Sequence, residues 1–402
     1  MTMRVLFGHP SGTPFSHQAA LSHYEAGRLE AYCLPWMPSP TTLRMLAAIK
    51  PLAPMAARLG RRYFPPLAKA PLVQGRVAEW RRLFLRAIGR GGDELTREAN
   101  EWLMRVMSQE CRRASVSAIH AYEDSALWQF AEAKTLGKFC IYEMPVVYFP
   151  VRERLISALE RKYPDWIKPG RAVQLASTAQ KQKEMELADL VLAPSNFAAA
   201  SIREYFPDKR IAIAPYGIAL EAWSFHERKT PDTVTFLYAG QCSIYKGTPL
   251  LLRAWEAAGL KNARLVLVGG WRMPEEKKRS LPAGCHWLGA ISQEELRAHY
   301  RDADVFVFPT NFEGFGLVVT EALASGLPVL TTQGRGADSV IETASGRTVP
   351  PDDLDALVED LRWFARNRDR LPAMSVAARA NAERFTWTHY RRSVDRALDG
   401  LA

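Results

Sequence analysis

Two glutamates stand eight residues apart in the segment 311–329, which reads NFEGFGLVVTEALASGLPV. The apolar run before this segment predicts a strand that ends at Pro309, and the pattern after it predicts a helix over residues 317–326. Glu313 therefore lies in the loop that opens the helix, and Glu321 lies inside the helix. We expect both carboxylates to face the same cleft.

The loop between this strand and this helix also suits an anion. Exposed amides at a helix N-terminus bind negative charge, and Gly314 and Gly316 let a phosphate approach the backbone closely. Carboxylates are poor ligands for phosphate but good acceptors for hydroxyl groups. The segment therefore predicts a pocket in which acids hold the hydroxyls of a sugar and a ribose, while backbone amides hold the phosphates of a nucleotide sugar.

Short apolar runs alternate with helical patterns in both halves of the chain, as parallel sheets require. The runs begin near residues 4, 118, 139, 190 and 211 in the first half and near 235, 265, 286, 305 and 329 in the second. We therefore predict an α/β fold of two doubly wound, Rossmann-like domains that face a cleft. The predicted domains span residues 1–220 and 221–385, and residues 386–402 form a C-terminal helix.

The composition fits a globular protein of two or three domains, with 402 residues of which 48% are hydrophobic and 24% charged. The apolar runs are only as long as strands, so we expect no membrane span, and the N-terminal apolar stretch is too short for a signal peptide. The five cysteines lack C-x-x-C spacing, which argues against a zinc site or a disulfide framework. These features favour a cytoplasmic protein.

The net charge of +10 resides in one segment. Residues 44–90 hold 11 Lys and Arg but a single acid, Glu79, whereas the rest of the chain is balanced. A single patch indicates a docking surface rather than the domain-wide field of a nucleic-acid binder. Within it, residues 75–90 predict a basic amphipathic helix. Its apolar face holds Val77, Trp80, Phe84, Ala87 and Ile88, and another face holds Arg82, Arg86 and Arg90. The apolar face either packs on the core or lies on an anionic membrane surface.

The motifs of the second half resemble those of retaining glycosyltransferases of family 4, whose fold is GT-B. The most specific is E-G-F-G-L-x-x-x-E-A-L-A-x-G-x-P-V, which spans residues 313–329. Further segments agree in order at residues 238–240, 246–247, 265–269, 286–289, 294–296 and 303–307. The first half matches loosely, chiefly at residues 188–192, 194–195 and 215–217, as expected of a lobe that binds a variable acceptor.

The resemblance implies a role for each matching residue. Glu321 would bind the ribose hydroxyls of the donor, Glu313 the hydroxyls of the transferred sugar, and Lys246 the diphosphate; otherwise Lys246 is a solvated lysine at a helix start. Further donor contacts are implied at Gly240, Gln241, Ile291, Gly314, Phe315, Gly316 and Leu317. The resemblance also implies metal-independent chemistry without a cofactor, and a C-terminal helix that crosses back to the first domain.

Two positions depart from the family pattern. Gln241 stands where many relatives have an arginine that shares the diphosphate with the lysine. Either Arg335 or Arg272 replaces that cation, or phosphate binding relies more on the helix end. In the first domain the family often shows H-x-H followed by an acid, with the second histidine at the reaction centre. The segment 119–124, IHAYED, places Tyr122 there instead.

Several polar residues of the first domain are candidates for the catalytic or acceptor side of the cleft. His120, Tyr122 and Glu123 are the catalytic candidates, although His120 can also be a buried core histidine. Gly12, His17, Asp124 and Glu143 are acceptor-side candidates. His17 is alternatively a surface histidine in a first helical turn, and Glu143 alternatively caps a turn.

Two D-x-D pairs are present, but neither predicts a metal site. Asp302 and Asp304 open a strand on which they would diverge, and Asp353 and Asp355 fit the charged first turn of a helix. We therefore expect no metal.

The sequence thus predicts a glycosyltransferase of the hexosyltransferase type. We expect it to take a nucleotide sugar and a saccharide or lipid-linked acceptor, in the assembly of polysaccharide, lipopolysaccharide or glycolipid, without nucleic acid. We expect it in the cytoplasm, at the inner face of the membrane if residues 44–90 bind anionic lipid. The alternatives are a phosphorylase or a sugar-nucleotide epimerase of the same fold, and a non-catalytic binding protein.

Overall fold

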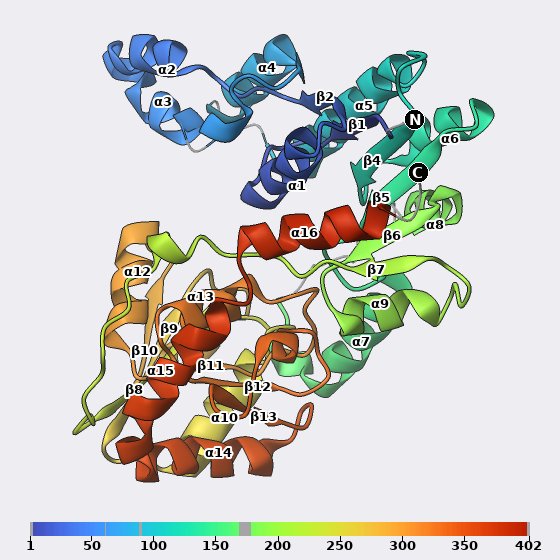
Figure 1. Cartoon of the computed structure of the whole chain (residues 1–402). Coiled ribbons are helices and arrows are strands. Elements are labelled where there is room, and N and C mark those ends of the chain that lie inside the picture. Colours follow the sequence, from blue (N-terminus) through green and yellow to red (C-terminus); the bar gives the residue numbers. More distant parts are fainter. Residues whose placement is uncertain (1–2, 61, 88–90, 169–177, 400–402) are drawn as a thin grey trace.

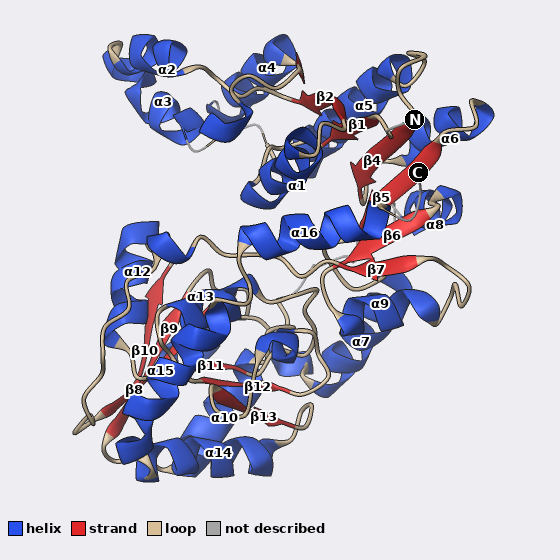
Figure 2. Cartoon of the chain, viewed as in Figure 1, coloured by secondary structure: helices blue, strands red, loops and turns tan. Residues whose placement is uncertain are grey.

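Figure 1 shows the computed structural model, which describes residues 3–60, 62–87, 91–168 and 178–399. The chain forms two lobes, and each lobe is built on a parallel sheet with helices packed against it (Figure 2). The predicted fold class, two Rossmann-like domains, is confirmed. None of the described helices combines the length and the apolar composition that a membrane-spanning helix needs.

The sheet of the first lobe has the strand order β3-β2-β1-β4-β5-β6-β7 within the described residues. Its strands are β1 (Val5–Gly8), β2 (Leu29–Leu34), β3 (Leu72–Gln74), β4 (Ala118–Tyr122), β5 (Phe139–Glu143), β6 (Leu190–Ala193) and β7 (Ile211–Ile213). The helices are α1 (Pro14–Glu25), α2 (Pro40–Ala47), α3 (Ala53–Gly60), α4 (Arg76–Ala87), α5 (Asp93–Glu110), α6 (Leu127–Thr135), α7 (Phe149–Lys162), α8 (Thr178–Leu187) and α9 (Asn196–Arg203).

The sheet of the second lobe has the order β10-β9-β8-β11-β12-β13. Its strands are β8 (Val234–Ala239), β9 (Ala263–Val268), β10 (Cys285–Gly289), β11 (Val305–Phe308), β12 (Val329–Thr332) and β13 (Gly346–Val349). The helices are α10 (Thr248–Ala258), α11 (Glu275–Arg279), α12 (Gln293–Asp302), α13 (Leu317–Ala324), α14 (Leu354–Arg366), α15 (Leu371–Ala382) and α16 (Trp387–Leu398).

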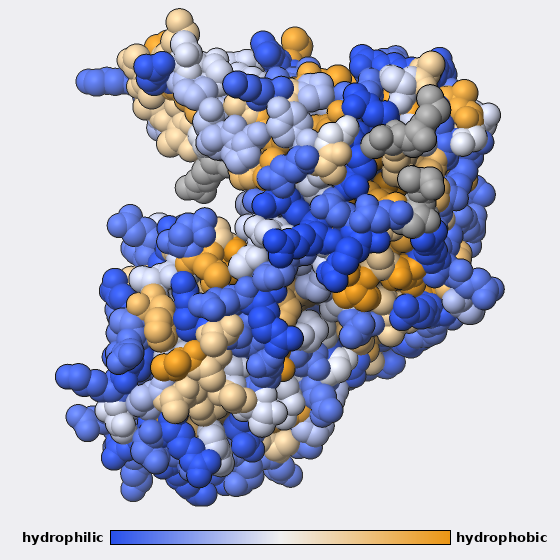
Figure 3. All heavy atoms as spheres, in the orientation of Figure 1, coloured by the Kyte–Doolittle hydropathy of each residue, from blue (hydrophilic) through white to orange (hydrophobic). Residues whose placement is uncertain are grey.

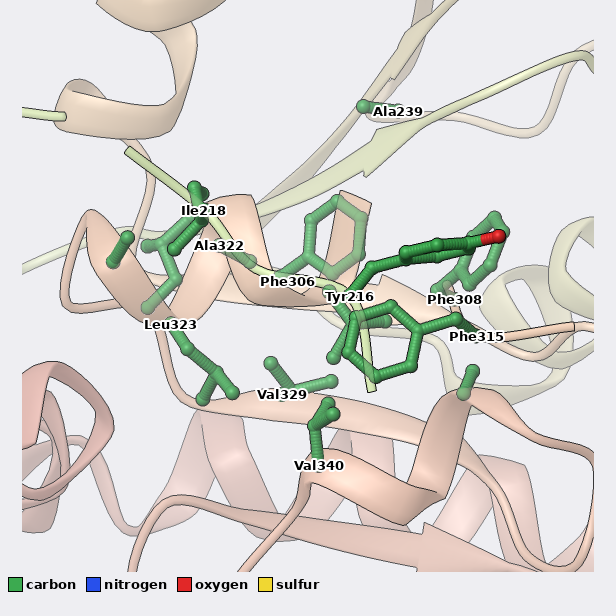
Figure 4. Close-up of a cluster of buried hydrophobic side chains, with 14 of the residues drawn as sticks. Tyr216, Ile218, Ala239, Phe306, Phe308, Phe315, Ala322, Leu323, Val329 and Val340 are labelled. Atoms are coloured by element: carbon green, nitrogen blue, oxygen red, sulfur yellow. The ribbon is translucent and has the colours of Figure 1, made fainter. Parts of the chain in front are cut away.

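Central strands such as β1, β6 and β11 are continuous apolar runs because both faces of the sheet are covered at these positions. In β1, Phe7 packs in the core on the α1 side, whereas its neighbour Leu6 packs on the α5 side with Leu103. In the second lobe, Phe306 and Phe308 of β11 lie beside the buried side of α13, as Figure 4 shows. This packing fixes α13 at the edge where the strands end.

The chain passes between the lobes twice, and the two passages lie side by side. The amide of Ile218 donates to the carbonyl of Phe385 (2.8 Å), and Ile218 forms a parallel bridge with Thr386. Tyr216 in the first passage packs edge-on against Phe315, with ring centroids 6.0 Å apart (Figure 4). The lobes are therefore connected through two hydrogen-bonded passages that lie next to each other.

After the second passage, α16 lies on the first lobe against α1 (Figure 1). Asp395 accepts a hydrogen bond from Ser22 (3.0 Å) and pairs with Arg28, and Arg391 donates to Gln18 (2.5 Å). The helix that begins in the sequence of the second lobe is thus held by polar contacts of the first.

The basic segment forms α2, α3 and α4, and the interpretation that the apolar face of α4 packs on the core is wrong. Val77 is 85% exposed and Phe84 64% exposed. The buried side of α4 instead carries Leu83 and Glu79, and the carboxylate of Glu79 is held by Arg62 (2.6 Å) and Arg82 (2.8 Å). Ile88 and Arg90 lie outside the described residues, as do the side chains of Arg86 and Ala87.

Candidate functional site

The loop that carries Glu313 lies at the carboxyl end of β11, directly before α13. α13 turns Val319 and Leu323 to the core, and Gly316 caps the helix with a left-handed backbone (φ 87°). The amide of Glu313 donates to the carbonyl of Arg335 (2.8 Å), which fixes the loop against the segment after β12. The carboxylate and the first amides of α13 therefore lie at one edge of the sheet.

Lys246 lies beside Glu313 because their two loops are hydrogen-bonded to each other. Asn311 donates from its backbone amide to Tyr245 (3.0 Å) and from its side chain to the carbonyl of Ile244 (2.9 Å). The ammonium of Lys246 forms an ion pair with the carboxylate of Glu313. Lys246 is thus part of the same site and not a freely solvated lysine.

The glycine after Lys246 has a steric reason. Gly247 has a φ of 72°, and a Cβ at this position would collide with the carbonyl of Pro309 at the end of β11. Only glycine tolerates both constraints. It lets the loop of Lys246 lie directly against the loop of Glu313.

Glu321 lies half-buried on α13 and has one hydrogen-bond partner in the described chain. The hydroxyl of Tyr300, on α12, donates to its Oε2 atom (3.2 Å). Burial raises the pKa of Glu321 to about 7, because the charged form loses contact with water. Tyr300 was not identified from the sequence as a partner of Glu321. The only signal for it in the sequence is that it is an aromatic residue in an otherwise polar helix.

Two arginines, Arg272 and Arg335, are the candidates to replace the cation that many relatives have at the position of Gln241. Gln241 is exposed after β8, and the amide of Arg272 donates to the carbonyl of its neighbour Cys242 (2.9 Å). Arg272 is exposed and forms no ion pair within the described ranges. Arg335 instead directs its guanidinium at the ring of Phe197, 5.8 Å from the centroid. Of the two arginines, Arg272 is better placed beside the strand end.

The remaining positions at which donor contacts are predicted lie in or beside loops at the ends of the strands of the second lobe. Gly240 directly follows β8, and its amide donates to the carbonyl of Val268 (2.9 Å). Ile291 is half-buried between β10 and α12, and Leu317 is 36% exposed in the first turn of α13. The side chain of Phe315 is buried, so that only its backbone can reach a ligand. Figure 3 shows an indentation between the lobes on the side of α12.

The loop of Glu313 also contacts the first lobe directly. The hydroxyl of Ser195 donates to the carbonyl of Gly314 (2.6 Å), and a Cβ on Gly314 would collide with the carbonyl of Pro145. Near this contact, Leu159 and Tyr163 at the end of α7 pack on Ile244 of the lysine loop. The loops of Glu313 and Lys246 are therefore held by contacts with the first lobe.

Two candidates of the first lobe, His120 and Glu143, are buried in one polar network. The Nε2 atom of His120 lies 3.1 Å from Glu143, and its Nδ1 atom lies 2.8 Å from His23. Glu143 also accepts from the hydroxyl of Tyr390 on α16 (2.9 Å). Neither ring nitrogen of His120 is free for a substrate, which favours the core interpretation. Glu143 neither faces open space nor caps a turn, but instead binds α16.

Tyr122, at the position of the expected reaction centre, is also buried. Its ring packs edge-on against His9 (4.7 Å between centroids) and lies near Phe15 (5.8 Å). His9 directly follows β1, and its Nδ1 atom accepts from the amides of Ser11 (3.1 Å) and Gly12 (3.2 Å). Burial lowers the pKa of His9 to about 3, so the ring is neutral. Sequence reasoning missed His9, although a polar residue directly after a strand was the signal.

Glu123 and Asp124 follow β4 but bind a residue of their own lobe. Both carboxylates pair with the ammonium of Lys181 on α8, at 3.0 and 3.2 Å. Asp124 has a left-handed backbone (φ 68°), and its amide donates to Glu184 (3.0 Å). The side chain of Asp124 is partly exposed, whereas that of Glu123 is buried against Lys181.

His17 is not a surface histidine, contrary to one interpretation of the sequence. It is 3% exposed, and its ring stacks on Phe64 at 5.3 Å with an interplanar angle of 7°. Its Nδ1 atom lies 3.3 Å from the hydroxyl of Tyr32. Gly12 lies over the ring, since a Cβ there would lie 3.4 Å from it. The buried ring of His17 thus packs against the loop after β1 at Gly12.

The D-x-D pairs have separate structural roles. Asp304 accepts from the amide of Thr235 (2.8 Å), whereas Asp302 pairs with Arg301. Asp353 caps α14 by accepting from Ala356 (2.9 Å). In the described part of the chain, no three His, Cys, Asp or Glu side chains gather as they would around a metal ion.

Comparison with known proteins agrees with this arrangement. Residues 221–381 match the family model of glycosyl transferases group 1. The chain is 34% identical over 176 residues to D-inositol 3-phosphate glycosyltransferase of Streptomyces coelicolor, which covers 39% of this chain and 38% of the relative. It is 25% identical over 232 residues to lipopolysaccharide 1,2-N-acetylglucosaminetransferase of Salmonella typhimurium, which covers 51% of this chain and 61% of the relative.

The chain thus spans between about a third and three fifths of the first curated relatives that it matches. Solved structures match over the whole chain. Anabaena Alr3699/HepE in complex with UDP has a TM-score of 0.64 at 14% identity and covers 99% of this chain and 100% of its own. Sucrose-phosphate synthase from Thermosynechococcus elongatus has a TM-score of 0.63 at 17% identity, with coverage of 100% and 99%. Residues 221–381 thus match the family of glycosyl transferases group 1, and the whole chain has the GT-B fold of these solved structures.

Proposed function

We propose that this chain is a retaining, metal-independent glycosyltransferase. It takes a nucleotide sugar as donor and transfers the sugar to a saccharide or lipid-linked acceptor, in the assembly of a cell-surface polysaccharide, lipopolysaccharide or glycolipid. One observation carries the proposal: the ion pair of Lys246 and Glu313 and the carboxylate of Glu321 lie around the start of α13, at the edge that meets the other lobe.

In this proposal each group acts on a different part of the donor. The transition state of glycosyl transfer resembles an oxocarbenium ion, and negative charge grows on the leaving phosphate. Lys246 and the first amides of α13 stabilise that charge, and Arg272 supplies the cation that Gln241 lacks. Glu313 accepts from the hydroxyls of the sugar and Glu321 from those of the ribose. The leaving phosphate takes the proton of the acceptor hydroxyl on the same face, which retains the configuration.

The nature of the relatives supports a nucleotide-sugar donor. Anabaena Alr3699/HepE has been crystallised in complex with UDP-glucose, and another relative is a GDP-mannose:cellobiosyl-diphosphopolyprenol alpha-mannosyltransferase. The contacts between the lobes at Gly314 and α7 would exclude water, which favours transfer over hydrolysis.

A product analysis tests the proposed reaction. The protein is incubated with radiolabelled UDP-glucose, GDP-mannose or UDP-N-acetylglucosamine and with a lipid extract as acceptor. We expect label in a lipid or saccharide product with the anomeric configuration of the donor. Conversion to an epimeric nucleotide sugar, or release of sugar 1-phosphate from a glycan by added phosphate, would instead identify an epimerase or a phosphorylase. Binding of a nucleotide sugar without any turnover would favour a non-catalytic protein.

We further propose that the segment 44–90 holds the protein on an anionic membrane at the cytoplasmic face. The outer side of α4 exposes Val77, Phe84 and part of Trp80, and Met45 is 67% exposed on α2. These apolar side chains fit an acidic lipid surface, in which they enter the acyl boundary. Basic residues of the segment other than Arg62 and Arg82, which hold Glu79, meet the lipid phosphates. The five cysteines are buried and unpaired, as expected in the cytoplasm.

Sedimentation with vesicles tests this contact. Val77→Asp should lower the binding constant for vesicles with phosphatidylglycerol by roughly tenfold, because a buried valine contributes about 1.5 kcal/mol or more. Val376→Asp, at a 51% exposed valine on α15, should leave binding unchanged. Binding should also weaken at high salt. Equal binding of the two variants, or no binding of the unaltered protein at any salt concentration, would contradict the proposal.

A further inference from the structure

A cavity of about 650 Å³ lies where β2 and β3 end, between the loop after β2 and the first turn of α4. Small-molecule sites commonly measure roughly 300–1,000 Å³. β2 and β3 run parallel to the other strands of the sheet, with Leu34 opposite Gln74. The cavity therefore lies on the same edge of the sheet as the loops after β5 and β6, which contact Gly314 of the second lobe.

Two indole rings form one wall of this cavity. The rings of Trp36 and Trp80 lie 5.4 Å apart at an angle of 39°, and Tyr63 is also part of the lining. Trp36 is buried, whereas Trp80 is 39% exposed. An indole offers a flat apolar face and a polar N–H edge. Such surfaces match a sugar ring, which has an apolar C–H face and a hydroxyl-bearing rim.

The polar groups of the lining leave donors for a ligand. The side-chain oxygen of Gln74 accepts from the amide of Met37 (3.0 Å), which orients the side chain; its nitrogen has no hydrogen bond within the described residues. Arg76 is exposed and has no ion pair in that same part of the chain. The lining contains no acidic residue. A free guanidinium without a competing carboxylate suits a phosphate, which it binds with two parallel hydrogen bonds.

The neighbouring cavity, between α4 and α5, shows the contrast. Its volume is about 250 Å³, and its lining includes Glu79, Glu98 and Glu101 together with arginines. There Arg81 pairs with Glu98 (2.5 Å) and Arg82 with Glu79 (2.8 Å). Carboxylates in that lining compete with an anion for its arginines, so this cavity suits a phosphate less well.

We propose that the cavity of Trp36, Trp80, Gln74 and Arg76 is the acceptor site, and that its ligand is a saccharide that carries a phosphate. The sugar ring lies on the indoles, and the phosphate is held by Arg76. This inference rests on the proposed glycosyltransferase function. Trp80 belongs both to the cavity and to the exposed side of α4. A phosphate that links a sugar to a lipid would therefore lie at the membrane surface, whereas a free sugar phosphate would enter from solution.

Fluorine NMR of the full protein labelled with 5-fluorotryptophan tests the site without turnover. The chain has 11 tryptophans, and the variants Trp36→Phe and Trp80→Phe assign the two resonances of the cavity. The probes are glucose 1-phosphate, mannose 1-phosphate and N-acetylglucosamine 1-phosphate at millimolar concentration, with the free sugars for comparison. We expect at least one of the sugar phosphates to shift both resonances in a saturable way. Tighter binding of a polyprenyl-phosphate-linked sugar in neutral vesicles would assign the lipid source, and equal binding the soluble source.

Matched arginine variants complete the test. Arg76→Gln should weaken binding about tenfold or more, the value of a hydrogen bond to a charged group. Arg44→Gln, at an exposed arginine of α2 outside the lining, should not. The proposal would be overturned if no probe gives a saturable shift, or if Arg76→Gln leaves the affinity of the probe unchanged. It would also be overturned if only the resonances of Trp271 and Trp287, near the end of β9, shift. A failure of the proposed function gives a different result: the resonances of Trp36 and Trp80 shift with the sugar phosphates, but the protein turns over no nucleotide sugar.

Discussion

Lys246→Ala should lower kcat/KM for transfer by roughly 100- to 1,000-fold, the usual cost of removing one group that stabilises a developing anion. The ammonium of Lys246 is held at the entrance of α13 by Glu313 and by the hydrogen-bonded loops of Asn311 and Tyr245. Its loss removes positive charge where the leaving phosphate gains negative charge. It also leaves Glu313 without its counter-ion, so that the carboxylate repels the diphosphate of the donor.

Three comparisons make this expectation specific. Lys261→Ala changes an exposed lysine of the same lobe and should keep full activity. Lys246→Arg keeps the charge but changes its geometry, so it should retain part of the activity. The melting temperature of Lys246→Ala should stay near that of the unaltered protein, because a partly exposed ion pair contributes little to stability. Full activity of Lys246→Ala would contradict the assignment of the donor site.

Glu321→Ala should abolish measurable transfer at a subsaturating concentration of the donor. The unaltered protein should bind the donor more weakly as the pH falls through 7. Burial raises the pKa of Glu321 from its ordinary 4.5 to about 7. Below that pH the carboxyl keeps its proton and accepts poorly from the ribose hydroxyls. Between about pH 8 and pH 6 the ionised fraction falls about tenfold, and the donor affinity should fall with it.

The sign of the stability effect follows from the same pKa. The unfolded carboxyl ionises near 4.5, whereas the folded one keeps its proton up to about 7. The folded state therefore binds more protons between these values, and the free energy of unfolding falls as the pH rises through that window. Glu321→Gln removes this dependence and should flatten the pH profiles of both stability and donor affinity. Binding calorimetry in two buffers should show proton release by the unaltered protein between about pH 6 and pH 7.

A matched control separates Glu321 from other acids of the lobe. Glu256 is exposed on α10, and Glu256→Gln should leave the pH profile of donor binding as it is in the unaltered protein. A profile of Glu321→Gln that still falls below pH 7 would show that another group titrates. Donor affinity that is unchanged in Glu321→Ala would mean that the carboxylate does not contact the ribose.

Local pattern predicted the central elements of the second lobe but not β13 (Gly346–Val349). The apolar run of β11, the glycines before α13 and the spacing of Glu313 and Glu321 predict a strand, a loop and a helix that the structure contains. These features depend on interactions over a few residues, and a parallel sheet brings the ends of its strands to one edge. The family resemblance implied that Lys246 belongs to this site, and the structure adds its pairing with Glu313, 67 residues later in the sequence.

Side-chain roles in the first lobe were less predictable. His120 and Glu143 each stand near a strand end, as catalytic residues do, yet His23 and Tyr390 enclose them. Tyr390 lies on α16, which packs on the first lobe although the whole sequence of the second lobe separates α16 from it. No local pattern indicates such a partner, because burial depends on what packs over a position.

The sequence alone determined which residues of the second lobe share an edge, because strand, turn and helix signals are local and parallel strands fix where their ends meet. Tertiary structure alone decided which side of each element meets the core. A helical period identifies the faces of α4 but does not say which one is inside. Here the inner face carries Leu83 and Glu79, and Arg62 and Arg82 hold the carboxylate of Glu79. Paired charges compensate one another within the lobe, which leaves Val77 and Phe84 outside.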